Sequence, residues 1–157
     1  VALLNIGSEE AKGNAMIRDT YQKLNENKYP LFDFNGYIEG NNIMEGDVNV
    51  IVADGFTGNI ALKTAEGTSN FIIAELKKAL TTSIIGKLSS LLNFNNLNNF
   101  KKKLDPRLYN GAILLGLNKP VIKSHGSTDS IGFANSLKVC EKTIKGKLIE
   151  QIKNNIS

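Results

Sequence analysis

The sequence contains few of the residues from which metal sites and disulfides are built. Its 157 residues include a single cysteine, Cys140, and a single histidine, His125. One cysteine excludes an intrachain disulfide and a zinc site made of cysteines. One histidine excludes the metal sites that need two or three histidines. We therefore expect neither a metal nor any other cofactor, and both counts fit a reducing cytoplasm.

Tryptophan is absent, and no apolar run approaches the roughly 18–20 residues that cross a bilayer. The net charge of +4, from 19 basic and 15 acidic residues, favours an anionic partner only slightly. Aromatic and basic residues do not alternate as they do in proteins that bind single strands, so no nucleic-acid partner is expected. The composition, 41% hydrophobic and 22% charged, is typical of a folded globular protein.

Hydrophobic patterns predict strands that alternate with helices in a single domain over residues 1–157. The expected strands are 1–6, 31–38, 48–53, 111–117 and 121–123. The expected helices are 8–24, capped by Ser8, then 59–80, with Gly67 as a weak point, and 129–154, with Phe133, Leu137, Cys140 and Ile144 on one apolar side. This order predicts an α/β fold with a mostly parallel sheet covered by helices. The apolar opening VALLNIG lacks the basic leader of a signal peptide, so we expect a strand and a piece of a longer chain.

Residues 81–104 are expected to form a helical protrusion. One apolar helical face is predicted from Ile84, Ile85, Leu88, Leu91 and Leu92, followed by a turn in the asparagine-rich stretch 93–99 and a returning helix that ends at Asp105-Pro106. In one interpretation Leu88, Leu91 and Leu92 enter lipid while Lys101, Lys102 and Lys103 meet anionic head groups. In the other, the apolar face is buried against a second copy of the chain and the lysines lie in solvent.

The segment DGFTGNIALK follows a predicted strand and leads into a predicted helix. In α/β sheets, ligands bind at the carboxyl ends of the strands. Glycines let backbone N–H groups approach an anion, and a helix N-terminus adds positive potential. The candidate phosphate ligands are Asp54, Gly55, Thr57, Gly58 and Asn59, with the ammonium group of Lys63 one turn further on. The alternative is a tight turn in which Asn59 caps the helix.

The segment VIKSHGSTDS repeats this arrangement at the end of another predicted strand. The candidate ligands are Ser124, Gly126 and Ser127, and a hydroxyl at position 127 or 128 is expected to cap the helix that follows. His125 is a candidate acid or base, with a structural hydrogen bond as the alternative. Because Ser124 and His125 are adjacent, their side chains diverge and a serine–histidine dyad is not expected. No G-x-S-x-G motif is present, and no covalent nucleophile is predicted.

Five stretches keep the order and spacing of one known family: Leu3–Asn14, Phe34–Gly40, Asp54–Gly67, Leu104–Leu117 and Val121–Ser136. With them the chain resembles the acyl-(acyl carrier protein):phosphate acyltransferases of bacterial phospholipid synthesis. The resemblance extends over nearly the whole chain and is to the carboxyl-terminal half of that family. The family's amino-terminal half, which has its own glycine-rich loop, is not represented.

The resemblance implies transfer of a long-chain acyl group from acyl carrier protein to inorganic phosphate, giving an acyl phosphate for phospholipid synthesis. It implies a homodimer of three-layer α/β/α subunits, related in fold to phosphate acetyltransferases and isocitrate dehydrogenases. It also implies a cytoplasmic enzyme that associates peripherally with the inner face of the cell membrane. Lys63, Lys123 and His125 are then the candidate catalytic residues, and Asp54 orients its neighbours. We expect the first loop to hold phosphate and to face the loop 123–127, where His125 or Lys123 stabilises the oxyanion or the leaving thiolate.

Three alternatives remain open at this stage. The chain could be phosphate acetyltransferase-like and use acetyl-coenzyme A, or it could be a non-catalytic part that supplies dimerisation or carrier-protein docking. A nucleotide-dependent dehydrogenase is disfavoured because the dinucleotide-binding glycine pattern is absent. If the chain lacks a covering partner, apolar surface is exposed, and we expect the isolated chain to self-associate.

Overall fold

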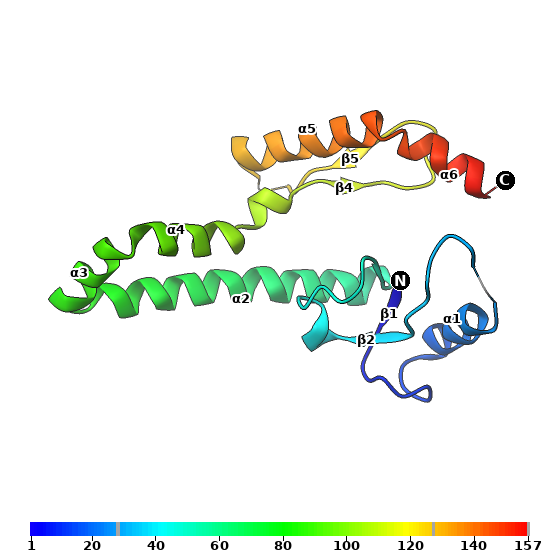
Figure 1. The fold of residues 1–157 in the computed structure, drawn as a ribbon, viewed down its shortest axis with the longest axis horizontal. Coiled ribbons are helices and arrows are strands. Elements are labelled where there is room, and N and C mark those ends of the chain that lie inside the picture. Colours follow the sequence, from blue (N-terminus) through cyan, green and yellow to red (C-terminus); the bar gives the residue numbers. More distant parts are fainter. Residues whose placement is uncertain (28, 127, 157) are drawn as a thin grey trace. The chain divides into compact units, whose positions relative to one another are not determined.

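The computed structural model describes residues 1–27, 29–126 and 128–156, with the backbone alone at 156. The chain divides into two compact units, Val1–Ala65 and Glu66–Ser157, here called the first and the second unit. The boundary between them falls inside the long helix α2 (Gly55–Thr81), shown in Figure 1.

A parallel three-stranded sheet forms the core of the first unit, and its strands β1 and β2 are labelled in Figure 1. Strand β1 (Ala2–Asn5) is paired on one side with β2 (Tyr37–Glu39) and on the other with β3 (Ile51–Val52). All four residues of β1 are buried, as expected for the middle strand of a parallel sheet. The buried apolar residues are Ala2, Leu3, Leu4 and Ile38, and Ala61 of α2 packs against this core. The predicted α/β class is confirmed, and the arrangement is consistent with α/β/α layers.

The first helix begins later than the sequence predicts. Helix α1 is Ala15–Glu26, and its cap is Asn14, whose side chain accepts from the N–H of Ile17 at 2.9 Å. The residues before it form a loop, because Asn5 Nδ2 donates to the carbonyls at Gly7 (3.1 Å) and Lys12 (3.2 Å). Gly13 then adopts a φ of +90°, which a right-handed helix excludes. The predicted cap at residue 8 is therefore wrong.

The strands of the first unit are shorter than predicted. Of the predicted strand 31–38, only the last two residues belong to β2, because Gly36 has a φ of +75° and interrupts the extended backbone. Of 48–53, only Ile51 and Val52 form β3. A 3₁₀ turn, η1 (Gly40–Asn42), follows β2.

The second unit contains the rest of α2, then α3 (Ile84–Leu92), α4 (Phe94–Lys103) and a 3₁₀ turn η2 (Pro106–Tyr109). An antiparallel pair of short strands follows, β4 (Ala112–Ile113) and β5 (Ile122–Lys123). Helix α5 (Ser130–Lys145) contacts η2, β4 and β5, and α6 (Leu148–Ile156) ends the described chain (Figure 1). The predicted long strand 111–117 is thus reduced to two residues in a hairpin.

Two further helix predictions are corrected. The asparagine-rich stretch does not form a turn: Asn93 alone separates α3 from α4, and the remaining asparagines lie within α4. Asparagine is a modest helix former rather than a helix breaker, so the flanking apolar residues determine whether this stretch is helical. The predicted helix 129–154 is interrupted at Gly146 and Lys147, where Lys147 adopts a φ of +50°. Gly67, by contrast, does not break α2.

Helix α5 buries a face of small and polar residues rather than its apolar side. Its buried residues are Gly132, Ser136 and Thr143. The predicted apolar side is largely exposed, with Phe133 at 53%, Leu137 at 57% and Ile144 at 59%. Cys140, predicted to be a core residue, is half-buried. Small side chains let the backbone of α5 approach η2 and the hairpin closely, and this brings the start of α5 next to the loop that follows β5.

Candidate active site

The first candidate loop is the start of a helix. Helix α2 begins at Gly55, so residues 55–58 form its first turn, and the predicted start of this helix at residue 59 is wrong. Asp54 caps this turn: its Oδ1 accepts from the N–H groups of Phe56 (2.9 Å) and Thr57 (2.8 Å), and its Oδ2 accepts from Thr57 Oγ1 (2.6 Å). The hydroxyl of Thr57, followed by its N–H, lowers the pKa of the Asp54 carboxyl group.

This cap changes what the first turn can offer to an anion. Two of its N–H groups and the hydroxyl of Thr57 are already bonded to a carboxylate, so an incoming phosphate must compete for them. Asn59 and Lys63 are exposed and lie four residues apart, which places both on one side of α2. Among the predicted ligands of the first unit, these two side chains are the best placed to meet a ligand without displacing the cap.

The second candidate loop lies between β5 and α5, in the second unit. Lys123 ends β5, Ser124 is half-buried, and His125 and Gly126 are exposed. Ser127 lies outside the described residues. The helix cap is neither of the two predicted hydroxyls but Asp129, whose Oδ1 accepts from the N–H of Gly132 at 3.0 Å. This hydrogen bond, and then the guanidinium of Arg107, lower the pKa of the Asp129 carboxyl group.

Asn110 organises this second loop, and the sequence did not single it out. Its side chain contacts four groups: Oδ1 accepts from His125 N (3.0 Å), and Nδ2 lies within donor distance of Ser124 Oγ (2.9 Å), Thr128 Oγ1 (3.1 Å) and the carbonyl of Gly132 (3.0 Å). Ser136 Oγ lies 3.1 Å from Ser124 Oγ. The four partners of Asn110 are 14 to 22 residues further along the chain, so no local pattern could have identified it.

Arg107 joins the turn η2 to the start of α5. Its guanidinium pairs with Asp105 Oδ2 at 2.6 Å and with Asp129 Oδ2 at 2.7 Å. The side-chain hydrogen bond from Arg107 lowers the pKa of the Asp105 carboxyl group. Because Asp129 also caps α5, one arginine fixes both the turn that precedes Asn110 and the helix that follows the loop.

The predicted membrane-contact residues lie on the surface of α3 and α4. Leu88, Leu91 and Leu92 are 59%, 71% and 80% exposed. Lys101, Lys102 and Lys103 are exposed and form the last turn of α4. Helices α3 and α4 contact each other, so both sets belong to one helical pair. None of the described helices is both long and apolar enough to cross a membrane.

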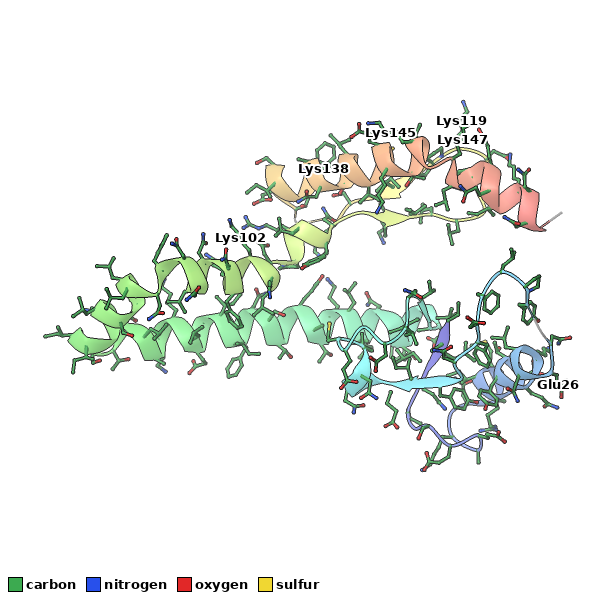
Figure 2. The ribbon with its side chains drawn as sticks, viewed as in Figure 1. Glu26, Lys102, Lys119, Lys138, Lys145 and Lys147 are labelled. Carbon is green, nitrogen blue, oxygen red and sulfur yellow. The ribbon has the colours of Figure 1, made fainter. Side chains whose placement is uncertain are left out.

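The two units carry opposite net charges. The first has 5 basic and 9 acidic residues, a net charge of −4, and the second has 14 basic and 6 acidic residues, a net charge of +8. Exposed lysines of the second unit are labelled in Figure 2: Lys102, Lys119, Lys138, Lys145 and Lys147. In the part of the chain that the structure describes, no three His, Cys, Asp or Glu side chains gather as a metal site. The excess positive charge of the chain therefore lies in the second unit.

Comparison with known proteins gives one family and many relatives. Residues 1–151 match the family model described as "Fatty acid synthesis protein". A protein of Pelagibacter ubique named "Phosphate acyltransferase" is 70% identical over 156 residues, which cover 99% of this chain and 47% of that protein. Proteins of the same name from Fusobacterium nucleatum and Rhodospirillum rubrum are 48% and 43% identical, and the matches cover 46% and 45% of their lengths. The chain thus spans slightly less than half the length of these curated relatives.

Proposed function

The chain belongs to the fatty acid synthesis protein family, and we propose that it is part of an enzyme that transfers a long-chain acyl group from acyl carrier protein to inorganic phosphate. The observation that carries this proposal is the 70% identity, over 99% of the chain, with a protein named "Phosphate acyltransferase". The product would be an acyl phosphate that feeds phospholipid synthesis.

The reaction needs positioning more than it needs a nucleophile from the enzyme. An oxygen of hydrogen phosphate attacks the thioester carbonyl, the carbon–sulfur bond breaks, and the proton of phosphate ends on the carrier thiol. Because a thiol has a pKa of about 8.5, its thiolate is a good leaving group near neutral pH. Catalysis then depends on holding phosphate against the carbonyl and on hydrogen-bond donors for the oxyanion. This requirement fits a chain for which no covalent nucleophile is predicted.

We assign phosphate binding to the first turns of α2. Lys63 and Asn59 bind phosphate with exposed side chains, and the backbone at Gly55 and Gly58 allows a close approach. Asp54 holds the turn in place through its bonds to the N–H and hydroxyl groups of Thr57. Thr57 can donate to phosphate only when its hydroxyl leaves Asp54, so its role is secondary.

We assign the oxyanion and the leaving thiolate to the loop after β5. His125 and Lys123 are both exposed there and supply the cationic or donor groups. Ser124, Gly126 and Ser127 assist in binding phosphate. The net charge of +8 on the second unit supports this assignment, because phosphate and the developing oxyanion are both anionic.

The test is product formation by the complete gene product with two acyl donors. Long-chain acyl-(acyl carrier protein) or acetyl-coenzyme A is mixed with phosphate, and acyl phosphate is trapped as its hydroxamate, with phosphate-free reactions as the blank. We expect phosphate-dependent product from the carrier thioester. A preference for acetyl-coenzyme A would indicate the phosphate acetyltransferase alternative. A folded protein that gives no product with either donor would favour a role in dimerisation or carrier docking.

We further propose that α3 and α4 touch the inner face of the cell membrane. The exposed leucines of α3 and the lysines that end α4 support this, since apolar side chains beside basic residues favour anionic bilayers. Changing Leu88, Leu91 and Leu92 together to Ser should abolish co-sedimentation with anionic liposomes and leave activity in solution intact. The matched control is Leu115→Ser, another exposed leucine of the second unit. Unchanged sedimentation of the triple variant would refute membrane contact.

The active protein is proposed to be a homodimer. The exposed apolar side of α5, with Phe133, Leu137 and Ile144, supports burial against further protein. Light scattering of the complete gene product should give twice the mass of one chain. A monomer at micromolar concentration would contradict the dimer.

A further inference from the structure

Asn110 lies where three parts of the second unit meet. It directly follows η2, its Oδ1 holds the loop after β5 through His125 N, and its Nδ2 reaches the first turn of α5 at the carbonyl of Gly132. One amide therefore ties the two sides of the loop together. Movement of the loop relative to α5 would break several hydrogen bonds at once.

The backbone on both sides of Asn110 is fixed against α5. On one side, the guanidinium of Arg107 pairs with Asp105 at 2.6 Å and with Asp129, the cap of α5, at 2.7 Å. On the other side, Gly111 has a φ of +116°, and a Cβ there would lie 3.1 Å from Ser136 Cα. Only glycine suits that conformation and that close approach. The amide of Asn110 is consequently presented from an ordered support.

The contacts of Asn110 determine where the hydroxyl proton of Ser124 can point. The NH₂ group of an amide only donates, and the two protons of Asn110 Nδ2 are shared among three nearby acceptors. When it donates to Ser124 Oγ, the nearest of them at 2.9 Å, it occupies one lone pair of that hydroxyl. When Ser136 donates across its 3.1 Å contact, the second lone pair is occupied as well. The proton of Ser124 is then directed to a third group, such as a phosphate oxygen.

The same amide fixes the start of the His125 side chain. The N–H of His125 is bonded to Asn110 Oδ1 and cannot donate to a ligand, so His125 can act only through its imidazole. Anchoring the backbone at this residue limits the directions that the imidazole can take.

We propose that Asn110 is a positioning residue of the reaction, which orients Ser124 and His125 toward the bound acyl and phosphate groups. This proposal rests on the proposed phosphate acyltransfer. Asn110 itself touches neither substrate. Its contribution comes from the 2.9 Å and 3.0 Å contacts to the two residues that do.

A double-mutant cycle in the complete gene product tests the proposal. Asn110→Ala and Ser124→Ala should each lower kcat/KM for phosphate by about 10²-fold, since small misplacements of reacting groups are costly. Asn110→Ala leaves the hydroxyl of Ser124 without its orientation, and Ser124→Ala removes that hydroxyl. Because both substitutions thus abolish the same contribution, kcat/KM of the double variant should be no more than about threefold below that of the less active single variant. Losses that multiply would overturn the proposal, as would a Ser124→Ala variant with wild-type rates.

Asn135→Ala is the matched control. It removes a side-chain amide that also bridges α5 and the η2 segment, but this amide donates to the carbonyl of Arg107 rather than to a described residue of the loop. We expect a loss of thermal stability similar to that of Asn110→Ala with less than about threefold change in kcat/KM, because positioning is intact. An equal loss of activity in both variants would show a general structural effect and overturn the proposal.

An NMR measurement separates this inference from the proposed function. The Cε1–H signal of His125, assigned with His125→Gln, should shift or broaden in Asn110→Ala and stay unchanged in Asn135→Ala. An unchanged His125 signal in folded Asn110→Ala would overturn the positioning role even if acyl phosphate is formed. Absence of acyl phosphate from the wild-type protein would refute the acyltransfer alone.

If Asn110→Ala fails to fold, Asn110→Asp replaces it. This variant keeps the acceptor for His125 N–H and loses the donors, and it should still lower kcat/KM at least tenfold. Wild-type kinetics of Asn110→Asp would overturn the proposal.

Discussion

At the end of β3 the chain passes into α2 through Ala53 and Asp54, whereas at the end of β5 it forms a longer loop before α5 begins. An aspartate caps the helix in both places. At the first junction, that aspartate bonds to Phe56 and Thr57, two and three residues further on. At the second, Asn110 and Arg107 reach the junction from an earlier part of the chain. The first junction is thus a local structure with exposed side chains for binding, and the second is a tertiary structure able to orient groups for chemistry.

The two junctions also lie in units of opposite net charge. The first junction lies in a unit of net charge −4, and Lys63 is its proposed phosphate ligand. The second lies in a unit of net charge +8. Loss of one cation should therefore weaken binding at the first junction, while loss of an oriented group at the second should weaken the chemical step.

The largest effect is expected at the second junction. His125→Gln should lower kcat by about 10²–10³-fold, the usual cost of removing one donor to a developing oxyanion. The Michaelis constant for phosphate should change little. Steady-state rates at saturating acyl donor measure both constants. The control is Lys119→Gln, an exposed lysine outside the loop. A decrease in kcat of less than tenfold would exclude His125 from the chemical step.

At the first junction the effect should appear in binding. Lys63→Ala should raise the Michaelis constant for phosphate by about 10- to 100-fold, since hydrogen bonds to charged groups contribute about 1.5–3 kcal/mol. The decrease in kcat should be smaller than that of His125→Gln. Lys77→Ala, an exposed lysine further along the same helix, serves as the control. A pure loss of kcat in Lys63→Ala would move this lysine from binding to chemistry.

Alanine at one glycine of each junction should change stability in opposite directions. A Cβ at Gly132 would collide with Thr128 Oγ1 and lie 3.3 Å from Asn110 Nδ2, so Gly132→Ala should lower the free energy of unfolding by about 1–3 kcal/mol. A Cβ at Gly58 meets only Ala53 Cβ, at 3.5 Å. Gly58→Ala should therefore raise the free energy of unfolding by up to about 1 kcal/mol, because alanine has the higher helix propensity. Urea unfolding measures both. Equal destabilisation would mean that the two junctions are packed alike.

The smallest effect concerns the acid dependence of the first junction. Because the pKa of Asp54 is lowered in the folded state, its stabilisation is complete above the ordinary aspartate pKa of about 3.9 and is lost as pH falls through the lowered value. Asp54→Ala should therefore lower Tm at pH 7, by about 2–4 °C. The difference in Tm between Asp54→Ala and wild type should disappear as pH falls below about 4, because Asp54 then becomes protonated. Asp47→Ala, at an exposed acid outside the helices and strands, provides the baseline. A gap that is constant from pH 7 to pH 3 would contradict the capping role.

The sequence predicted what depends on local pattern. The apolar segments of β1, β3, α2 and α5 were located, and Asp105-Pro106 correctly marked the end of α4. It could not predict that Asn5 would hold a loop in place of the first turn of a helix, because that depends on hydrogen bonds to Gly7 and Lys12. Asn110 was missed for the same reason: an asparagine before a glycine suggests a turn and says nothing of a partner at His125.

The prediction that the helix starts only at residue 59 failed because Gly55 and Gly58 were given too much weight. Asp54 supplies a cap that compensates for their poor helix propensity. The chemistry assigned to Lys63 and His125 remains a prediction, made from residue type and from the family.

The most direct measurement is the phosphate dependence of carrier-protein release from a long-chain acyl-(acyl carrier protein), followed with the complete gene product and with Asn59→Ala, Lys63→Ala and His125→Gln. We predict release that saturates with phosphate in the wild type, needs much more phosphate in the two α2 variants, and is nearly lost in His125→Gln at any phosphate concentration. Absence of release from the folded wild-type protein, or release that all three variants leave unchanged, would contradict the assignment of these two junctions to phosphate acyltransfer.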